Sequence, residues 1–172
     1  MTDRVISFRA LSEVDLGQLY VWLNKDHLRR NVQPEPISLS EIHAKYLPRL
    51  ALDHPVNGHM VCLDGQAIGY MQCYRVSTQA DFARDIEEAQ GVGLDLFIGE
   101  AQHIGQGIGK QMLRDYVTEI VPALFPDERT CFIAHEVTNE AAIHCSLAAG
   151  FTYTRDIVEN GKPSKLLTKQ MC

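Results

Sequence analysis

The sequence predicts an α+β fold, a sandwich-like arrangement with a mixed central sheet of about six to seven strands and helices on both faces. Short apolar runs bounded by turn residues recur along the chain, as strands do. Between them lie stretches whose apolar residues recur every three or four positions, as in amphipathic helices. The 172 residues suit one domain, which we expect to span residues 1–172.

The N-terminal half carries the signals of a strand, two helices and a hairpin. The pair Ser12-x-x-Asp15 resembles a capping box ahead of residues with helical apolar spacing, and Pro48 should interrupt or kink the next helix. Asp64-Gly65 suits the positive φ angles of a type I′ turn between two apolar runs. The elements expected here are a strand at 5–10, helices at 14–23 and 40–47, and hairpin strands at 59–63 and 67–74.

The C-terminal half contains the strongest helical pattern of the chain. Between Ile108 and Leu124, apolar residues step by three and four positions and indicate an amphipathic helix. Asn139 can cap a later helix, Gly150 suits the position after its end, and Asn160-Gly161 is a turn signal. The elements expected here are an acidic stretch without strand pattern at 77–93, strands at 92–98 and 130–134, a glycine-rich connection at 99–109, helices at 108–124 and 139–148, and hairpin strands at 151–157 and 165–171.

The charge balance bears on the kind of partner. Sixteen Lys and Arg against twenty-two Asp and Glu give a net charge of −6. Nucleic-acid binding rests on Lys and Arg contacts to phosphate, so we expect no nucleic-acid partner. A cationic small molecule suits a negative protein, although plain solubility explains the same charge. No apolar run is long enough to span a membrane, and charge interrupts the first residues, so we expect no membrane partner and a cytoplasmic protein.

The cysteine and histidine spacing predicts no metal site. The five cysteines are odd in number and include no C-x-x-C pair, which speaks against a disulfide framework and against a zinc ribbon. Seven scattered histidines form no H-E-x-x-H motif. We therefore expect buried, reduced thiols.

The segment Gln102-His-Ile-Gly-Gln-Gly-Ile-Gly-Lys110 carries the clearest chemical signal. Three glycines at alternate positions follow a strand and open a helix. Glycine permits positive φ angles, so several N–H groups can converge on an anion at the helix N-terminus, where the helix dipole adds to the attraction. The spacing matches neither a P-loop nor a dinucleotide fingerprint. A phosphate cradle and a purely structural turn both remain open at this point.

A second segment makes the glycine loop more specific. Strand, Q-H-I-G-Q-G-I-G, helix and strand are followed by N-E-A-A-I-H-C-S-L-A-A-G-F at 139–151. In this order the two segments resemble the acetyl-CoA-binding segments of the GNAT acetyltransferase superfamily, which implies the GNAT fold. Residues 19–27 (L-Y-V-W-L-N-K-D-H), 65–74 and 93–95 are most similar to the aminoglycoside 6′-N-acetyltransferases.

The resemblance implies acetyl-CoA as cosubstrate. It places a pyrophosphate cradle on the glycine loop, a pantetheine contact on Asn139, and a backbone N–H that polarises the thioester near Phe97 or Ile98. The cofactor-binding residues expected on this basis are Leu96, Phe97, Ile98, Ile104, Gly105, Gln106, Gly107, Ile108, Gly109, Lys110 and Asn139.

Two residues are candidates for catalysis. Asp95 is the only ionisable residue of its predicted strand and occupies the slot of the family's acceptor-binding carboxylate, where it would attract an ammonium group and accept its proton. A solvated or ion-paired Asp95 is the alternative. Ser146 stands where many members carry a Tyr that protonates the leaving thiolate, and core packing is the alternative there. The substrate-binding residues expected are Asp95, Gln72, Tyr74, Glu136, Glu87, Glu88 and His27.

The resemblance implies an acetyl-CoA-dependent N-acetyltransferase acting on a primary amine of a cationic small molecule, namely the 6′-amine of aminoglycoside antibiotics. One alternative is an N-acyltransferase of siderophore or lysine hydroxylamines. Another is a catalytically degenerate module that binds coenzyme A. Ser146 and Ile104, which stands where the family often has Arg or Gln, fit that module, whereas Asp95 would have no role in it. The chain is expected to be a monomer or a homodimer.

Overall fold

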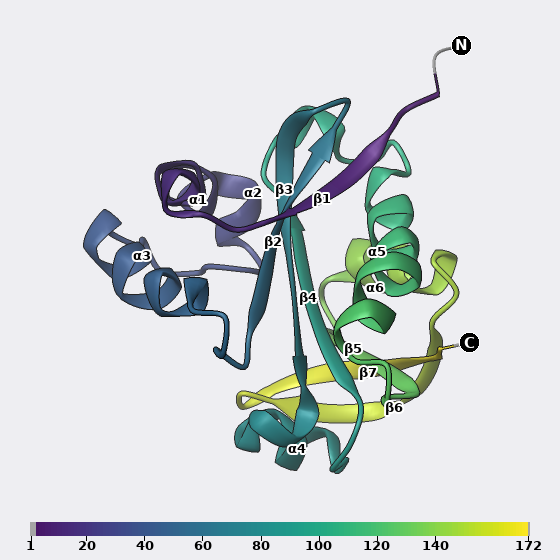
Figure 1. Cartoon of the computed structure of the whole chain (residues 1–172). Helices are drawn as coiled ribbons and strands as arrows, with labels where there is room; N and C mark the ends of the chain where they lie inside the picture. The colour runs from purple at the N-terminus through teal and green to yellow at the C-terminus, as the bar shows by residue number, and fades with distance from the viewer. Residues whose placement is uncertain (1–2, 172) are drawn as a thin grey trace. The chain divides into compact units, whose positions relative to one another are not determined.

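The computed structural model describes residues 3–171 and contains one mixed sheet of seven strands in the order β1-β2-β3-β4-β5-β7-β6 (Figure 1). The elements in chain order, with η for a short 3₁₀ turn, are β1 (Ile6–Ala10), η1 (Glu13–Asp15), α1 (Leu16–Leu23), α2 (Asp26–Arg29), α3 (Leu39–Tyr46), η2 (Leu47–Leu50), β2 (Asn57–Leu63), β3 (Gln66–Arg75), η3 (Val76–Thr78), α4 (Ala80–Ile86), β4 (Val92–Ile98), η4 (Ala101–His103), α5 (Ile108–Leu124), β5 (Thr130–Glu136), α6 (Glu140–Ala148), β6 (Thr152–Glu159) and β7 (Lys162–Gln170). The predicted α+β class with a mixed sheet is confirmed.

The chain forms two compact units. Unit 1 contains the residues up to Gln72 together with Leu96–Gln106, and unit 2 contains Cys73–Asp95 together with the residues from Gly107 on. In unit 1, β1 pairs antiparallel with β2. In unit 2, β4 begins parallel to β5, and β7 pairs antiparallel with both β5 and β6.

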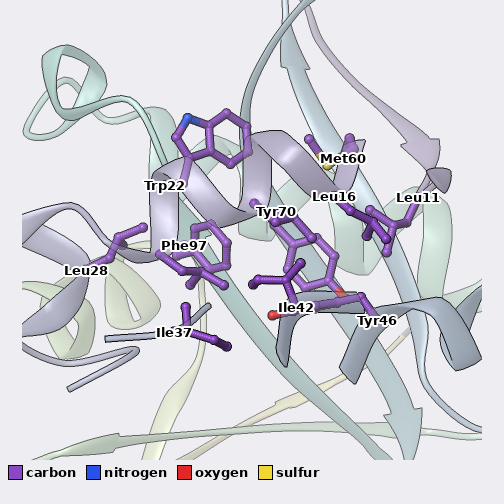
Figure 2. Packing of buried hydrophobic residues seen from close by; sticks show 12 residues of the cluster. Leu11, Leu16, Trp22, Leu28, Ile37, Ile42, Tyr46, Met60, Tyr70 and Phe97 are labelled. Carbon is purple, nitrogen blue, oxygen red and sulfur yellow. The ribbon is translucent and has the colours of Figure 1, made fainter. Parts of the chain in front are cut away.

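The core of unit 1 lies between the helices α1, α2 and α3 and the strands β2, β3 and β4 (Figure 2). Its centre is aromatic. Tyr70 meets Tyr46 edge to face at 5.7 Å between ring centroids and lies 5.6 Å from Phe97, whose ring in turn meets Trp22 edge to face at 6.3 Å. Rings packed in this way contribute more than the burial of their area alone.

Unit 2 carries helices on both faces of its strands. On one face, Phe132 and Leu166 pack with Ile86 of α4. On the other, His135 of β5 bonds to Ser146 of α6. Neighbouring residues of a strand point to opposite faces, so Phe132, Ala134 and Glu136 share the α4 face whereas His135 points to α6.

Turn and cap signals predicted several element boundaries correctly. α5 spans the predicted residues, and α6 begins after Asn139, whose Oδ1 accepts the Ala142 N–H at 3.3 Å. Asp64 and Gly65 both take positive φ angles, as the type I′ turn requires. Asn160 and Gly161 do the same between β6 and β7.

One expectation was wrong. The expected order of elements contained no helix in the acidic stretch 77–93, whereas the structure has α4 there. The residue before this helix, Gln79, makes no side-chain cap, and three of the seven helix residues are charged. Tertiary contacts hold it instead: Ile86 is buried, and the Asp85 carboxylate accepts the backbone N–H of Asn160 at 3.1 Å. Such contacts leave no periodic pattern in the sequence. The one-turn helix α2 also went unpredicted.

Candidate active site

The glycine loop leads from η4 into α5. Gly105 and Gly107 both have φ of 77°, a left-handed conformation that costs other residues energy. A Cβ built on either glycine meets nothing within 4 Å, so backbone conformation rather than crowding requires glycine here. Gly107 is the N-cap of α5 and provides no side-chain cap for the N–H groups of the first turn. Residues 104–107 are exposed, whereas Ile108 and Gly109 are buried. The loop can therefore offer backbone N–H groups and the dipole of a 17-residue helix to an anion.

In unit 1, the end of β4 is held firmly by its neighbours. Phe97 is buried in the aromatic core. The N–H groups of Gly99 and Glu100 both point to the Ile68 carbonyl, at 2.7 and 3.3 Å. His27 Nε2 lies 3.0 Å from the Ile98 carbonyl oxygen. The backbone expected to polarise the thioester is thus fixed directly before the glycine loop.

In unit 2, the beginning of β4 carries Asp95. The parallel register with β5 covers Val92↔Cys131 and Gly93↔Phe132, and within unit 2 it stops there. Asp95 is exposed and lies two residues beyond Gly93, on the face that Phe132 and α4 share. A Cβ at Gly93 would collide with the Tyr74 ring, so glycine lets this ring lie against β4.

Several carboxyl side chains of unit 2, Asp95 among them, act by their charge on Glu159. We call Asp95, Glu136 and Glu159 the carboxylate cluster. Burial first, and then the negative charges of Asp95, Asp85 and Glu136, together raise the pKa of Glu159 to about 7. Lys162 Nζ lies 2.9 Å from Glu136 Oε1 and neutralises part of this charge. The cluster can attract a cation and can hold a proton at neutral pH.

Sequence reasoning missed Glu159. Its position directly before the Asn160-Gly161 turn was the available signal, because a residue on an end of a hairpin can reach a neighbouring strand end. The strand β7 lies between β5 and β6, where Glu136 pairs with Ser164 and Ser164 with Ile157. Ile157 and Glu159 share one face of β6, so the topology brings Glu159 toward Glu136.

Three other residues predicted to bind the acceptor differ in their contacts and in their exposure to solvent. Gln72 Oε1 accepts bonds from Arg49 and from Tyr70 OH, the latter at 3.0 Å. Tyr74 is buried against Phe82 in unit 2. Glu87 is exposed at the left-handed end of α4.

Glu88 of the same segment lies 3.9 Å from Arg155. Among the predicted acceptor residues, Asp95 and Glu136 both act by their charge on Glu159. Gln72 and His27 belong to unit 1, where their contacts are with Arg49, Tyr70 and the β4 backbone.

Ser146 is buried rather than open to solvent. It is 1% exposed, and its Oγ lies 2.8 Å from His135 Nε2. Burial lowers the pKa of His135 to about 4, so this imidazole is neutral at pH 7. A neutral imidazole offers one donor and one acceptor and can orient the Ser146 hydroxyl.

Residues 3–171 offer neither a membrane span nor a metal cluster. No helix there is long and apolar enough to cross a membrane. No three His, Cys, Asp or Glu side chains of that range are grouped so that they could hold a metal ion. Cys62, Cys73 and Cys131 are free, buried thiols, Cys145 is free and half-buried, and Cys172 lies outside the described residues.

Comparisons with known proteins agree with this geometry. The family model described as Acetyltransferase (GNAT) domain matches residues 12–158. The aminoglycoside N(6′)-acetyltransferases type 1 of Klebsiella pneumoniae and Serratia marcescens are each 30% identical over 152 residues, which cover 85% of this chain and 73% of theirs. The crystal structure of aminoglycoside acetyltransferase AAC(6′)-Ib in complex with coenzyme A and kanamycin matches with a TM-score of 0.79 at 24% identity, covering 96% of this chain and 95% of that one. This chain belongs to the GNAT acetyltransferase family.

Proposed function

We propose that this protein is an acetyl-CoA-dependent N-acetyltransferase whose acceptor is a primary amine of a cationic small molecule, the 6′-amine of an aminoglycoside. The observation that carries the proposal is the carboxylate cluster, in which an exposed Asp95 in the middle of a strand acts by its charge on Glu159. A module that only binds coenzyme A has no use for such a cluster. The names of the two curated relatives support the same acceptor.

The glycine loop and the start of α5 hold the pyrophosphate of acetyl-CoA in this proposal. Gly105 and Gly107 place the backbone so that N–H groups face the anion, and the exposed loop leaves room for it. Ile104, Gln106, Ile108, Gly109 and Lys110 complete this segment. Asn139 contacts the pantetheine arm, and the β4 backbone at Leu96, Phe97 and Ile98 donates an N–H to the thioester carbonyl.

Asp95 attracts the acceptor ammonium and takes its proton, directly or through one water. The free amine then attacks the thioester carbonyl carbon, a C–N bond forms, and the C–S bond breaks. The attacking nitrogen releases its second proton to water, and the products are an acetamide and the coenzyme A thiolate. With a thiol pKa of about 8.5, by analogy with cysteine, this thiolate leaves with little help from an acid. Ser146 is the only residue we propose as a donor to it.

Glu136, Glu87, Glu88, Gln72 and Tyr74 remain our candidates for contacts to the acceptor, whereas His27 contacts the β4 backbone. We further propose that residues 1–172 act as one catalytic domain in the cytoplasm, as a monomer or a homodimer. Free, buried thiols suit a reducing compartment.

Thiol release from acetyl-CoA tests the proposal. The purified chain is mixed with acetyl-CoA and, in separate reactions, kanamycin, a lysine derivative, N6-hydroxylysine or buffer alone. We expect release with kanamycin well above the buffer rate, and mass spectrometry should show one added acetyl group per sugar. Release with N6-hydroxylysine alone would assign the hydroxylamine chemistry instead. Binding of coenzyme A without release with any amine would show a binding module.

A further inference from the structure

The segment Trp22-Leu-Asn-Lys-Asp-His27 has no part in the proposed chemistry beyond the predicted acceptor contact of His27. In unit 1 it lies against the residues that follow β4. His27 Nε2 is 3.0 Å from the Ile98 carbonyl oxygen, and Lys25 Nζ is 3.4 Å from the Gly99 carbonyl oxygen. A carbonyl oxygen can only accept, so His27 donates its Nε2–H to Ile98.

Glu100, which follows β4, binds two residues of this segment. Its Oε1 accepts the Trp22 indole N–H at 2.8 Å, and its Oε2 accepts Lys25 Nζ at 3.1 Å. The hydrogen bond from Trp22 and then that from Lys25 lower the pKa of Glu100, which keeps it ionised at neutral pH. We call Trp22, Lys25, His27 and Glu100 the α1–α2 clamp.

The clamp holds two successive peptide groups at both ends. In the first, His27 binds the Ile98 carbonyl while the Gly99 N–H donates to the Ile68 carbonyl at 2.7 Å. In the second, Lys25 binds the Gly99 carbonyl while the Glu100 N–H points to the same Ile68 oxygen at 3.3 Å. Peptide groups bound on both sides cannot rotate independently, so the two peptide groups that follow Ile98 are fixed and anchor the end of β4.

Packing reinforces these hydrogen bonds. Trp22 is fully buried, beside Phe97 (Figure 2). Its ring covers the backbone at Gly99, where an added Cβ would overlap the indole carbons. Glycine at position 99 therefore lets the indole approach closely enough for its N–H to reach Glu100.

We propose that the α1–α2 clamp positions the β4 backbone so that the N–H at Phe97 or Ile98 points at the thioester carbonyl, with His27 as its principal positioning residue. The inference rests on the proposed function, because the clamp has a catalytic use only if acetyl-CoA binds at the end of β4. Hydrogen bonds weaken steeply as their angle departs from linear, and small misplacements of a catalytic group are costly. His27 then serves the reaction through the backbone rather than by touching the acceptor.

The test compares His27→Ala, His27→Gln and, as a control, His43→Ala on α3. The side-chain amide of Gln can place its N–H near the position of His Nε2. We expect His27→Ala to lower kcat about 10- to 100-fold. The KM for kanamycin and the Kd for coenzyme A should stay within about twofold, because the clamp aims a group and binds neither molecule. His27→Gln should recover most of kcat, and His43→Ala should match the wild type.

A spectroscopic measurement separates positioning from general structural damage. Acetyl-CoA labelled with ¹³C at the thioester carbonyl is bound to each variant, and the carbonyl stretch is recorded by isotope-edited infrared difference spectroscopy. Polarisation by an N–H lowers this frequency. We expect a shift in the wild type, a smaller shift in His27→Ala, and recovery in His27→Gln.

Two results would overturn the inference. The first is an unchanged carbonyl band together with an unchanged kcat in His27→Ala. The second is a raised KM for kanamycin with an unchanged kcat, because this result would mean that His27 binds the acceptor directly. If His27→Ala unfolds, Glu100→Gln replaces it, because this variant keeps an acceptor oxygen for the Trp22 N–H and replaces the oxygen that accepts from Lys25 by an NH2 group, which cannot accept. The same fall in kcat and in the carbonyl shift is then required. Failure of the wild type to bind acetyl-CoA would instead refute the proposed function.

Discussion

The carboxyl groups of Asp95 and Glu159 differ because their surroundings differ. Asp95 is exposed on β4, whereas Glu159 is half-buried at the end of β6. Burial first, and neighbouring negative charge second, raises the pKa of Glu159 to about 7. A cationic acceptor would relieve this repulsion, because it replaces like charges with opposite ones. Removing the charge of Asp95 and removing that of Glu159 should therefore have different effects.

Replacing Asp95 by Asn should remove the base and leave the shape of the site intact. We expect kcat/KM for kanamycin to fall by about 10²-fold or more, the usual contribution of a general base. The Kd for acetyl-CoA, measured by calorimetry, should stay within about twofold. Asp53→Asn, on an exposed loop, serves as the control. Wild-type turnover in Asp95→Asn would remove this residue from the mechanism.

Replacing Glu159 by Gln should stabilise the fold at high pH. The folded-state pKa is raised above the ordinary carboxyl value, so the favourable contribution is complete below about pH 4.5 and is lost as the pH rises through about 7. At pH 8 the variant avoids a buried negative charge, and its Tm should exceed that of the wild type by about 2–4 °C, or about 1 kcal/mol. At pH 4, below the ordinary carboxyl pKa, the two should melt together.

Asp156→Asn provides a control of opposite sign for this experiment. A hydrogen bond from Lys165 lowers the pKa of Asp156, so its favourable contribution is present at high pH and lost as the pH falls through the folded-state value. This variant should not gain Tm at pH 8. Equal melting of Glu159→Gln and the wild type at pH 8 would show that Glu159 carries no charge penalty in the folded state.

At the scale of elements, the sequence predicted the structure correctly where an apolar pattern was long or where a turn required positive φ angles. The helical spacing of apolar residues predicted both ends of the 17-residue helix α5. The pairs Asp64-Gly65 and Asn160-Gly161, which take positive φ angles, predicted the two hairpin turns. It failed for α4, whose stability comes from Ile86 in the core and from the bond between Asp85 and Asn160, 75 positions apart. Helices stabilised by packing rather than by propensity leave a weak pattern.

The start of α5 offers a test with a matched control. A Cβ added at Gly107 or at Gly17 would meet open space, but Gly107 has φ of 77° whereas Gly17 lies within α1. Gly107→Ala should destabilise the protein by about 1 kcal/mol and raise the Kd for coenzyme A, because the backbone is forced from its left-handed conformation.

Gly17→Ala should instead stabilise by about 0.5–1 kcal/mol, since alanine favours helix. Urea denaturation and calorimetry with coenzyme A measure both effects. A Gly107→Ala variant as stable as the wild type and equally competent to bind coenzyme A would separate this glycine from the cradle.

At the scale of the molecule, the structure shows which of the acidic residues are neutralised by basic neighbours. The sequence contains an acidic stretch at 77–93, but Arg84 lies 3.2 Å from both Asp81 and Asp85 and neutralises part of its charge. In the proposed function, the carboxylate cluster is the receptor for the cation. Neither this cluster nor the α1–α2 clamp could be predicted from spacing. Trp22 and Glu100 lie 78 positions apart, and only the folded topology brings them together.

This location of charge predicts how salt affects the enzyme. Exposed charges attract a polycation over about 10 Å at 0.1 M salt and over less at higher salt. Raising NaCl from about 0.05 to about 0.5 M should therefore lower kcat/KM for kanamycin several-fold and change kcat little, since salt weakens encounter rather than chemistry. A monoamine acceptor should respond less, and Glu136→Gln should flatten the dependence for kanamycin. An acceptor rate independent of ionic strength would mean that the −6 charge serves solubility and does not steer the substrate.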